Sequence, residues 1–459
     1  MIIFDKPLSE SLDVHIREHC QRQKRVGLLG TAGFLIGSYV GEDIHVAHIA
    51  ICSLPETADD SGDLRSRLVD SEWICDHSSR MLRLLPGGVD IVGLLWLADK
   101  KLSVEPRSVF IKALSTINQR TSAVSSLHCL PPRNYMALVC CETPLGKPQG
   151  YIIDSSRKGA EGSQTRVFFA SLEWLTVKSS AAFNISMPIK DPKTTINFYK
   201  LFCTAIYNWT NNFFDTETAL VNGQLRYGSE PLRSKQKKGK SGGSIRIDTF
   251  VSAGKDRLST VTSAVESVCV ADLKANISVY AAVSSKATVR DAINAVKQHV
   301  IRSLCSRAEL HYECTEVVED EPKDRISFHQ LPRLTCVTLP TQTAIIFTDY
   351  IFEGDSAKDS QESFKELLSL EVDEDQISDQ YERHLTETDL IRFDNLSENA
   401  AKLQKSSVSS SSQSVAAAIS VASKTMTVSN MVLISIVIAL LAIAVYLLVS
   451  SVNDKSATK

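Results

Sequence analysis

The run MVLISIVIALLAIAVYLLV at residues 431–449 is the strongest constraint on how this chain can fold. Its nineteen residues include no charged side chain, and Ser435 is the only strongly polar residue among them. A helix of about 20 apolar residues spans the roughly 30 Å hydrocarbon core of a bilayer, where a helix satisfies its own backbone hydrogen bonds. A buried helix of a globular domain would keep a polar face, which this run lacks. The sequence therefore predicts one C-terminal transmembrane helix.

Only ten residues, 450–459, follow the apolar run. So short a segment is still inside the ribosome when synthesis ends, so we expect insertion after translation, as in a tail-anchored protein. The N-terminus carries Asp5, Lys6 and Glu10 where a secretory signal peptide needs an apolar core. We therefore expect the large N-terminal region to face the cytosol and residues 450–459 to face the lumen.

The net charge and the cysteine content limit which functions are compatible with this chain. The formal net charge is −3 over 459 residues, and a nucleic-acid-binding surface needs clustered basic residues instead. The eleven cysteines form no C-x-x-C pair, and several lie in apolar stretches such as ALVCCET. This usage is typical of reduced, buried thiols in a cytosolic protein. We expect no nucleic-acid partner and no cofactor.

Hydrophobic patterning before the anchor predicts two α/β or α+β units. The first, at residues 1–190, begins with a hairpin over 25–52, because FLIGSYV and IHVAHIAI are short β-rich runs joined by Gly-Glu-Asp. The apolar run VDIVGLLWLA at 89–98 is typical of a central strand buried on both faces. The other elements expected in this unit are helices over 65–85 and 105–119 and strands over 136–142, 151–154 and 165–177.

The second unit is expected at residues 191–370. We expect in it helices over 194–209 and 288–310, strands over 244–252, 275–284 and 333–350, and a short helix near Phe364. Residues 371–430 are acidic and then rich in Ser, as in SSVSSSSQS, which is typical of a flexible tether. The anchor at 431–449 and the tail at 450–459 complete the predicted organisation.

A search for catalytic motifs finds none that is complete. Gly239-Lys240-Ser241 resembles the end of a phosphate-binding loop, but the glycine that should open the motif is Ser234. No G-x-S-x-G nucleophile elbow is present. The chain therefore gives no support to a nucleotide-binding or α/β-hydrolase site.

Two small clusters of metal-binding or nucleophilic residues also have plainer explanations. His45 and His48 lie three apart on a predicted strand, so their side chains should point to opposite faces and not share a metal. The side chains of Cys140 and Cys141 should diverge in the same way. A nucleophilic cysteine needs a lowered thiol pKa, which neither position indicates, so we interpret both pairs as structural.

The order of hairpin, helix and apolar strand resembles the MPN (JAMM) domain. Metalloprotease members of that family read roughly IVGWYHSHP followed by a spaced Ser and Asp. Aligning Ile91-Val92-Gly93 with that pattern puts Trp96 and Ala98 at the two histidine positions, and Pro106 and Val109 at the Ser and Asp positions. None of these side chains can bind Zn²⁺ or its water. The resemblance implies an MPN-like domain without a metal, and we predict no catalytic, cofactor-binding or metal-binding residue.

The whole arrangement resembles the odorant-response-abnormal family of tail-anchored trafficking factors. The matching stretches are GFLIGSYVGEDIHVAHIA at 33–50, RMLRLLPGGVDIVGLLWLAD at 80–99, LPRLTCV at 331–337 and the terminal anchor. The resemblance implies a non-enzymatic, chaperone-like factor in the endoplasmic reticulum membrane that helps seven-helix odorant receptors mature and reach cilia. It also implies binding to a cysteine protease specific for a ubiquitin-fold modifier.

Two hypotheses follow, from different classes. The first is a membrane-tethered adaptor for receptor biogenesis, favoured because no catalytic set is complete. The alternative is a tail-anchored hydrolase of the deubiquitinase type with an unrecognised active site. Bound zinc, or hydrolysis of a modifier-linked substrate, would favour the second hypothesis.

Overall fold

The computed structural model describes residues 1–26, 30–53, 71–98, 104–127, 134–143, 147–155, 162–189, 195–211, 217–233, 244–249, 267, 269–318 and 330–382. All of them lie in one compact unit, Met1–His384. No helix in this part of the chain is long and apolar enough to cross a membrane. The predicted span at 431–449 and most of the predicted tether lie outside the described residues.

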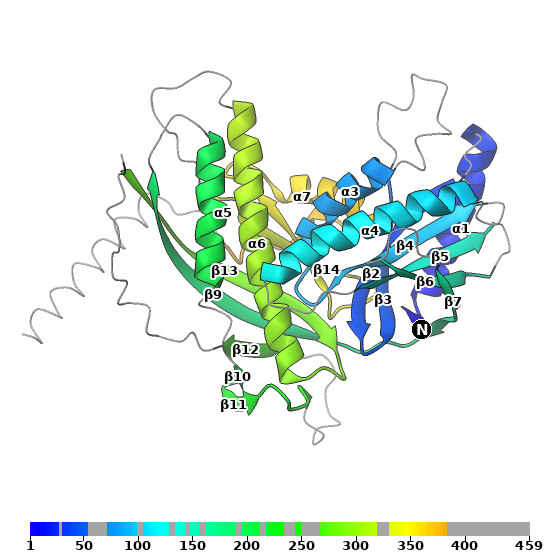
Figure 1. Cartoon of the computed structure of the whole chain (residues 1–459), viewed down its shortest axis with the longest axis horizontal. Coiled ribbons are helices and arrows are strands. Elements are labelled where there is room, and N and C mark those ends of the chain that lie inside the picture. The colour runs from blue at the N-terminus through cyan, green and yellow to red at the C-terminus, as the bar shows by residue number, and fades with distance from the viewer. Residues whose placement is uncertain are drawn as a thin grey trace, which may run out of the picture. The chain divides into compact units, whose positions relative to one another are not determined.

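The first sheet has eight strands in the order β7-β6-β5-β4-β2-β3-β1-β8 (Figure 1). The sheet is mixed, because β1 pairs in parallel with β3 and β8, and β4 pairs in parallel with β5, while the other neighbours are antiparallel. Its strands are β1 (Ile2–Asp5), β2 (Gly30–Val40), β3 (Asp43–Ile51), β4 (Asp90–Ala98), β5 (Tyr135–Glu142), β6 (Gln149–Asp154), β7 (Ser163–Thr165) and β8 (Val167–Ala170).

The first sheet curls round until its two end strands meet. β7 and β8 stand at opposite ends of the strand order, yet only Arg166 separates them in the chain. The carbonyl of Arg166 accepts a hydrogen bond from the Ile2 amide at 3.1 Å. A Cβ added to Gly150 on β6 would lie 2.8 Å from Val167 and 3.0 Å from Ile2. The sheet therefore wraps around an apolar interior that includes Phe4.

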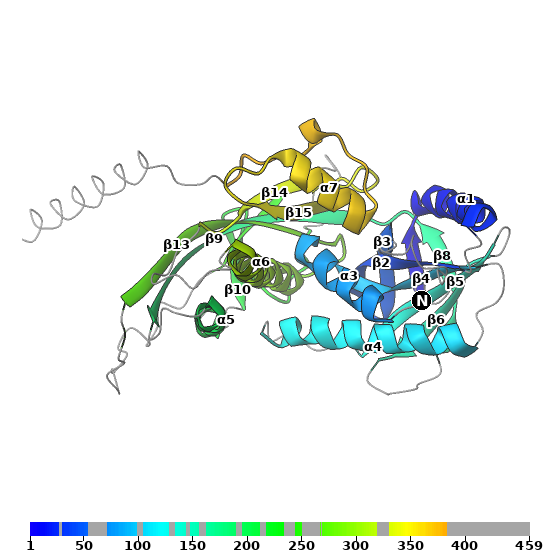
Figure 2. The ribbon, with the colours of Figure 1, turned by 90° about the horizontal axis from the view of Figure 1, so that it is seen from above.

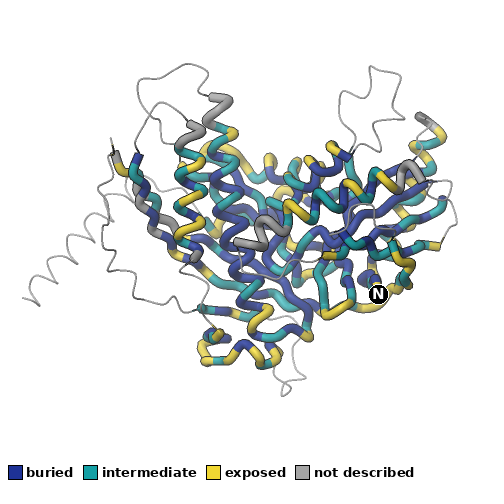
Figure 3. The backbone as a smooth tube through the Cα atoms, viewed as in Figure 1, coloured by how far each residue is buried: buried dark blue, intermediate teal, exposed yellow. Residues whose placement is uncertain are grey.

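Helices pack on both faces of this sheet. α1 (Leu8–Val26) places Leu8 and Leu12 against the apolar interior. On the other face, α3 (Ser71–Leu84) and α4 (Val104–Leu127) pack side by side. β4 runs between the two layers and is buried on both faces from Ile91 to Ala98 (Figure 3), which explains why it carries no polar alternation.

The second sheet has five strands in the order β11-β10-β12-β9-β13. β9 and β13 are paired over sixteen residues each, from Trp174↔Ser284 to Ile189↔Cys269. α5 (Thr195–Asn211) and α6 (Val289–Val318) cover one face of this sheet (Figures 1 and 2). The strands are β9 (Trp174–Ile189), β10 (Thr218–Val221), β11 (Gln224–Tyr227), β12 (Ile245–Thr249) and β13 (Cys269–Ser284).

A hairpin and a helix complete the described region. β14 (Arg333–Thr338) and β15 (Ile346–Ile351) pair antiparallel, and α7 (Ala357–Leu368) packs on β15, α3 and β3. Ser356 and Asp359 form a capping box at the start of α7. The side chain of each residue accepts a hydrogen bond from the backbone amide of the other. The 3₁₀ turn η3 (Glu374–Gln376) follows.

The mixed α/β fold predicted from the sequence is confirmed, and most expected elements are present. The predicted strand over 165–177 is wrong as a single element, because it corresponds to parts of β7, β8 and β9, and the one over 333–350 is two strands, β14 and β15. The division at residue 190 stays a prediction, although β9, which precedes it, belongs to the second sheet. The expected helix near Phe364 is α7.

Two neutral histidines hold the C-terminal end of α7. His48 Nε2 on β3 lies 2.7 Å from the carbonyl oxygen of Leu368, and His77 Nε2 on α3 lies 3.4 Å from that of Leu367. Burial lowers the pKa of His48 to about 4, against the opposing effect of its hydrogen bond to Leu368. Burial also lowers the pKa of His77 to about 4. Both rings are therefore uncharged near pH 7.

We expect the contribution of His48 to the free energy of unfolding to be lost on acidification. The unfolded chain binds a proton at His48 near pH 6.5, whereas the folded protein does so only near pH 4, so stability falls as the pH drops through this window. At pH 5 the loss from this residue is about 2 kcal/mol. His48→Gln keeps an N–H donor but does not titrate. Urea unfolding at pH 7 and pH 5 should show a smaller loss in the variant, and equal losses would contradict this assignment.

Candidate functional site at the junction of the two sheets

The end of β4, where an MPN metalloprotease would bind zinc, is filled by apolar side chains. Trp96 is 4% exposed, and its ring lies 5.0 Å from that of Phe110 on α4. Gly30 makes room for the indole, since a Cβ there would lie 2.2 Å from it. Ala98 is also buried, Val109 is half-buried, and the side chain of Pro106 is outside the described set. In the described part of the chain, no three His, Cys, Asp or Glu residues are grouped to hold a metal.

The cysteine pair diverges as predicted. Cys141 packs into the interior enclosed by the first sheet, whereas Cys140 is half-buried against the opposite core. Burial raises the pKa of the Cys141 thiol to about 12, so this residue is protonated at neutral pH and is a poor nucleophile. The possible phosphate loop at 239–241 lies outside the described residues.

The prediction that His45 and His48 point to opposite faces is wrong, because it assumed that side chains alternate strictly along β3. Ile36 faces His48, but the next residue, Gly37, faces Val46, so β3 has a bulge at Ala47. His48 is buried against Phe347, and His45 is half-buried. A bulge shifts the side-chain alternation by one residue, which spacing in the sequence could not reveal.

A buried arginine on α6 binds the turn that precedes β4. Arg302 Nη1 donates hydrogen bonds to the carbonyl oxygens of Leu85, Pro86 and Val89 at 3.0 to 3.2 Å. Its Nη2 donates to Asp90 Oδ1 at 2.5 Å. The two Nη1 protons are therefore shared among three carbonyl oxygens, and the same guanidinium neutralises one carboxylate. The Arg302 side chain is only 8% exposed.

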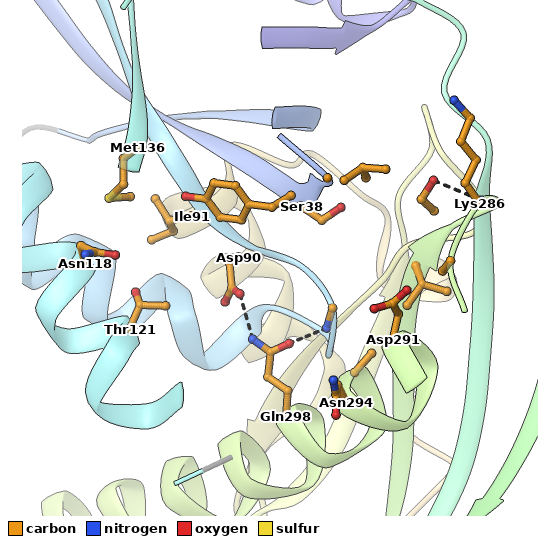
Figure 4. A pocket seen from close by; sticks show the side chains of 18 residues that line it. Ser38, Asp90, Ile91, Asn118, Thr121, Met136, Lys286, Asp291, Asn294 and Gln298 are labelled. Atoms are coloured by element: carbon orange, nitrogen blue, oxygen red, sulfur yellow. Dashed lines mark hydrogen bonds between the residues drawn. The ribbon is translucent and has the colours of Figure 1, made fainter. Parts of the chain in front are cut away.

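Gln298, one helical turn before Arg302, completes the network. Its Nε2 donates to Asp90 Oδ2 at 2.8 Å, and its Oε1 accepts from the Gly88 amide at 2.7 Å (Figure 4). We call Asp90, Gln298 and Arg302 together the junction network. It connects the first strand residue of β4 to the helix that covers the second sheet.

The two glycines of the turn are required by this packing. Gly88 has φ +80°, and a Cβ there would lie 2.3 Å from the carbonyl oxygen of Ala282 on β13. A Cβ on Gly87 would lie 1.9 Å from the carbonyl oxygen of Ala295 on α6. Gly87 also pairs with β13, through hydrogen bonds to Tyr280 and Ala282. The stretch LLPGGVD thus contacts both β13 and α6 at close range.

A pocket of about 380 Å³, lined by polar and apolar residues alike, opens at the junction network (Figure 4). Its walls come from β2, β4, α4, the end of β13 and the first turns of α6. The polar residues that line it include Tyr39, Asp90, Asn118, Asp291, Asn294 and Gln298. Asp90 is held by Arg302 and Gln298, and Asp291 accepts hydrogen bonds from the amide and hydroxyl of Thr288. Both carboxylates are thereby engaged in structural contacts.

The buried side of α6 carries further polar groups. Burial, with Arg302 and Arg307 nearby, lowers the pKa of His299 to about 3, so this ring stays uncharged. Arg307 Nη2 donates to Glu382 Oε2 at 2.5 Å, and the Arg307 guanidinium lies 5.1 Å from the Tyr350 ring centroid. Glu382 also accepts from the amides of Ser278 and Leu334. These contacts tie the last described residues to α6, β13 and β14.

Sequence reasoning missed the junction network. The run LLPGG indicates a helix stop and nothing more, and the partner arginine lies 212 residues beyond Asp90. The only available signal was the spacing of Gln298 and Arg302, which lie one turn apart on the predicted helix.

Comparisons with known proteins place the chain in a family. The odorant response abnormal 4-like family matches residues 33–379, a range that includes the second sheet, most of the first sheet and the junction network. Odorant response abnormal protein 4 of Caenorhabditis elegans is 34% identical over 395 residues, covering 84% of this chain and 82% of that protein. The chain belongs to the odorant response abnormal 4-like family.

Vertebrate relatives are more distant. The odr-4 homolog of Xenopus tropicalis is 21% identical over 81% of this chain and 85% of its own length, and the human homolog is 24% identical over 65% and 69%. Among solved structures, that of UfSP from C. elegans matches with a TM-score of 0.39 and 10% identity, covering 81% of this chain and 57% of that chain. A TM-score this low supports no conclusion about function.

Proposed function

We propose that this chain is a non-enzymatic membrane adaptor in the odorant response, which promotes the maturation and transport of odorant receptors. The observation that carries the proposal is family membership, through 34% identity to a protein named for an abnormal odorant response. The apolar filling at Trp96 and the raised pKa of Cys141 are consistent with a role without catalysis.

Membrane attachment is the second element of the proposal. The uncharged run at 431–449 would anchor the chain in the endoplasmic reticulum, with residues 1 to about 425 in the cytosol. Anchoring fixes whatever the cytosolic region binds close to newly made receptors, which raises the local concentration without any new chemistry. The partner in this scheme is a cysteine protease specific for a ubiquitin-fold modifier, which only the family resemblance supports.

The tether scheme predicts that the anchor supplies location alone. A chain ending at Ala400 should keep binding the protease in solution but leave it diffuse, and surface delivery of an odorant receptor should fall to the level without the protein. Fusing this shortened chain to the anchor of an unrelated tail-anchored protein of the same membrane should restore delivery. The measurement is receptor surface labelling in cells that lack the endogenous protein.

Two results would count against this scheme. If the swapped anchor reaches the correct membrane but delivery is not restored, the run at 431–449 must contact receptors itself. If the shortened chain supports full delivery, membrane attachment is not needed. Co-purification of the protease with the full chain, from detergent-solubilised membranes, tests the proposed partner separately.

A further inference from the structure

The pocket at the junction network has the size and the location of a ligand site. Its volume of about 380 Å³ falls within the roughly 300 to 1,000 Å³ that is usual for ligand pockets. Its walls come from strands of the first sheet, from α4, and from α6, which covers the second sheet. Ligand pockets are common at junctions of this kind. A ligand held here would contact both halves of the described fold.

Three neutral side chains in the pocket wall have hydrogen-bonding groups that no other described residue uses. They are the carboxamides of Asn118 on α4 and Asn294 on α6, and the hydroxyl of Ser38 on β2. Asn118 and Asn294 lie on opposite sides of Asp90 (Figure 4). The carboxamide of Gln298 in the same wall is, by contrast, bonded at both its oxygen and its nitrogen. Because each of the three groups can donate and accept, a ligand that satisfies them must offer both donors and acceptors.

The charged groups of the wall favour no ion of either sign. Asp90 is neutralised by its ion pair with Arg302. The other charged lining residues are Asp291 and Lys286, which have opposite signs and are both exposed. A cleft lined by one sign of charge concentrates ions of the opposite sign, and this wall is not of that kind. An uncharged ligand therefore fits the pocket best.

The apolar part of the wall is mainly aliphatic. Tyr39 supplies the one aromatic ring among the lining residues, and that ring packs edge-on against Tyr135. Flat ligands such as nucleobases are usually held by stacking on aromatic side chains, so this wall favours an aliphatic group. The buried aliphatic residues that line the pocket are Ile91, Met136, Val283, Ala287 and Ala295.

We propose that this pocket binds an uncharged peptide segment, through one aliphatic residue and the peptide groups on either side of it. A peptide group has one N–H donor and one C=O acceptor, which match the acceptor and donors of a carboxamide. Asn118 and Asn294 would each pair with one peptide group, and the aliphatic side chain would lie against Ile91 and Met136. This inference goes beyond the proposed function and does not depend on it, because it concerns binding by the purified chain.

The test uses N-acetyl-L-leucinamide, which has one leucine side chain between two peptide groups. Saturation-transfer NMR with the full chain, purified in detergent, detects probe methyl groups that contact the protein, and detergent alone is the blank. The probe should bind saturably. N-acetylglycinamide, which lacks the side chain, should bind roughly 10-fold more weakly or not at all. The D enantiomer of the leucine probe should also bind more weakly, because a built site fixes the arrangement of groups around Cα.

A longer probe tests whether the ligand is a segment of chain. Gly-Gly-Leu-Gly-Gly, acetylated and amidated at its ends, should bind at least as tightly as N-acetyl-L-leucinamide. Binding of the short probe without binding of the pentapeptide would show that the pocket takes small amides, and the peptide proposal would be wrong.

Substitution of the two asparagines locates the binding. Asn118→Leu and Asn294→Leu remove the carboxamide with little change in side-chain size, so each should weaken binding roughly 10-fold. Asn208→Leu, on the exposed side of α5 and outside the wall, is the matched control and should bind like wild type. Melting temperatures should stay near that of wild type, because neither pocket asparagine bonds another described residue. If a leucine variant does not fold, Asn118→Ser and Asn294→Ser take its place.

Three further results would overturn the proposal. The first is the absence of saturable binding of the leucine probe to the folded wild-type chain. The second is equal binding by wild type and both pocket variants, which would place the contact elsewhere. The third is equal binding of the two enantiomers, which is expected of nonspecific contact. Failure of receptor delivery in cells would count against the proposed function and not against this site.

Discussion

Arg302→Ala is expected to lower the free energy of unfolding by about 3 to 5 kcal/mol, because it removes one partner of a buried ion pair. The Asp90 carboxylate would keep only its bond to Gln298, and the carbonyls of Leu85, Pro86 and Val89 would lose the donor they share. Equilibrium unfolding in urea, followed by far-ultraviolet circular dichroism, measures the change.

The same helix supplies a matched control. Arg290 forms an exposed pair with Glu217 at 3.2 Å, and exposed pairs contribute about 0 to 1 kcal/mol. Arg290→Ala should therefore barely change the unfolding midpoint. Adding Asp90→Ala to Arg302→Ala should recover part of the lost free energy of unfolding, because the unpaired carboxylate of Asp90 is then removed. Equal effects of the two arginine substitutions would refute the structural role of the junction network.

The second large effect is expected for Trp96→Ala, which should lower the free energy of unfolding by about 3 to 5 kcal/mol because it leaves a cavity in the core. The indole is 4% exposed and packs on Phe110. Unchanged thermal stability would contradict the assignment of Trp96 to the core, and stoichiometric zinc in the purified protein would contradict the metal-free interpretation of this strand end.

Gly30 provides a specific test of the same packing. Gly30→Ala alone should destabilise the protein, because its Cβ would lie 2.2 Å from the indole. In the Trp96→Ala background that space is empty, so the second substitution should cost little. Strong non-additivity in the double mutant is the expected signature, and simple additivity would show that the two residues do not compete for one volume.

Local signals in the sequence predicted the elements that depend on neighbours in the chain. The β2–β3 hairpin follows from two β-rich runs and a turn in which Gly41 has φ +64°. Strand β4 follows from its uninterrupted apolar run. Each of these patterns is complete within about twenty residues, so no distant partner is needed to interpret it.

The parts that sequence reasoning missed depend on distant partners. Nothing near Asp90 indicates that Arg302 will bind it, and nothing near Leu368 indicates that His48 will bond its carbonyl, 320 residues away. The bulge in β3 comes from pairing with β2 and not from its own composition. Contacts of this kind are fixed by tertiary packing, which residue spacing does not encode.

The meeting of β7 and β8 at Arg166 determines the order in which the chain can fold during synthesis. β1 is made first, but its second neighbour, β8, exists only once Ala170 has been made. All eight strands of the first sheet have then been made, whereas Arg302 appears 132 residues later. During that interval the carbonyls of Leu85, Pro86 and Val89 lack the donor that Arg302 supplies. Strand pairing within the first sheet can therefore precede its attachment to the second, and we expect a ribosome stalled between these points to hold paired strands with an unfinished turn.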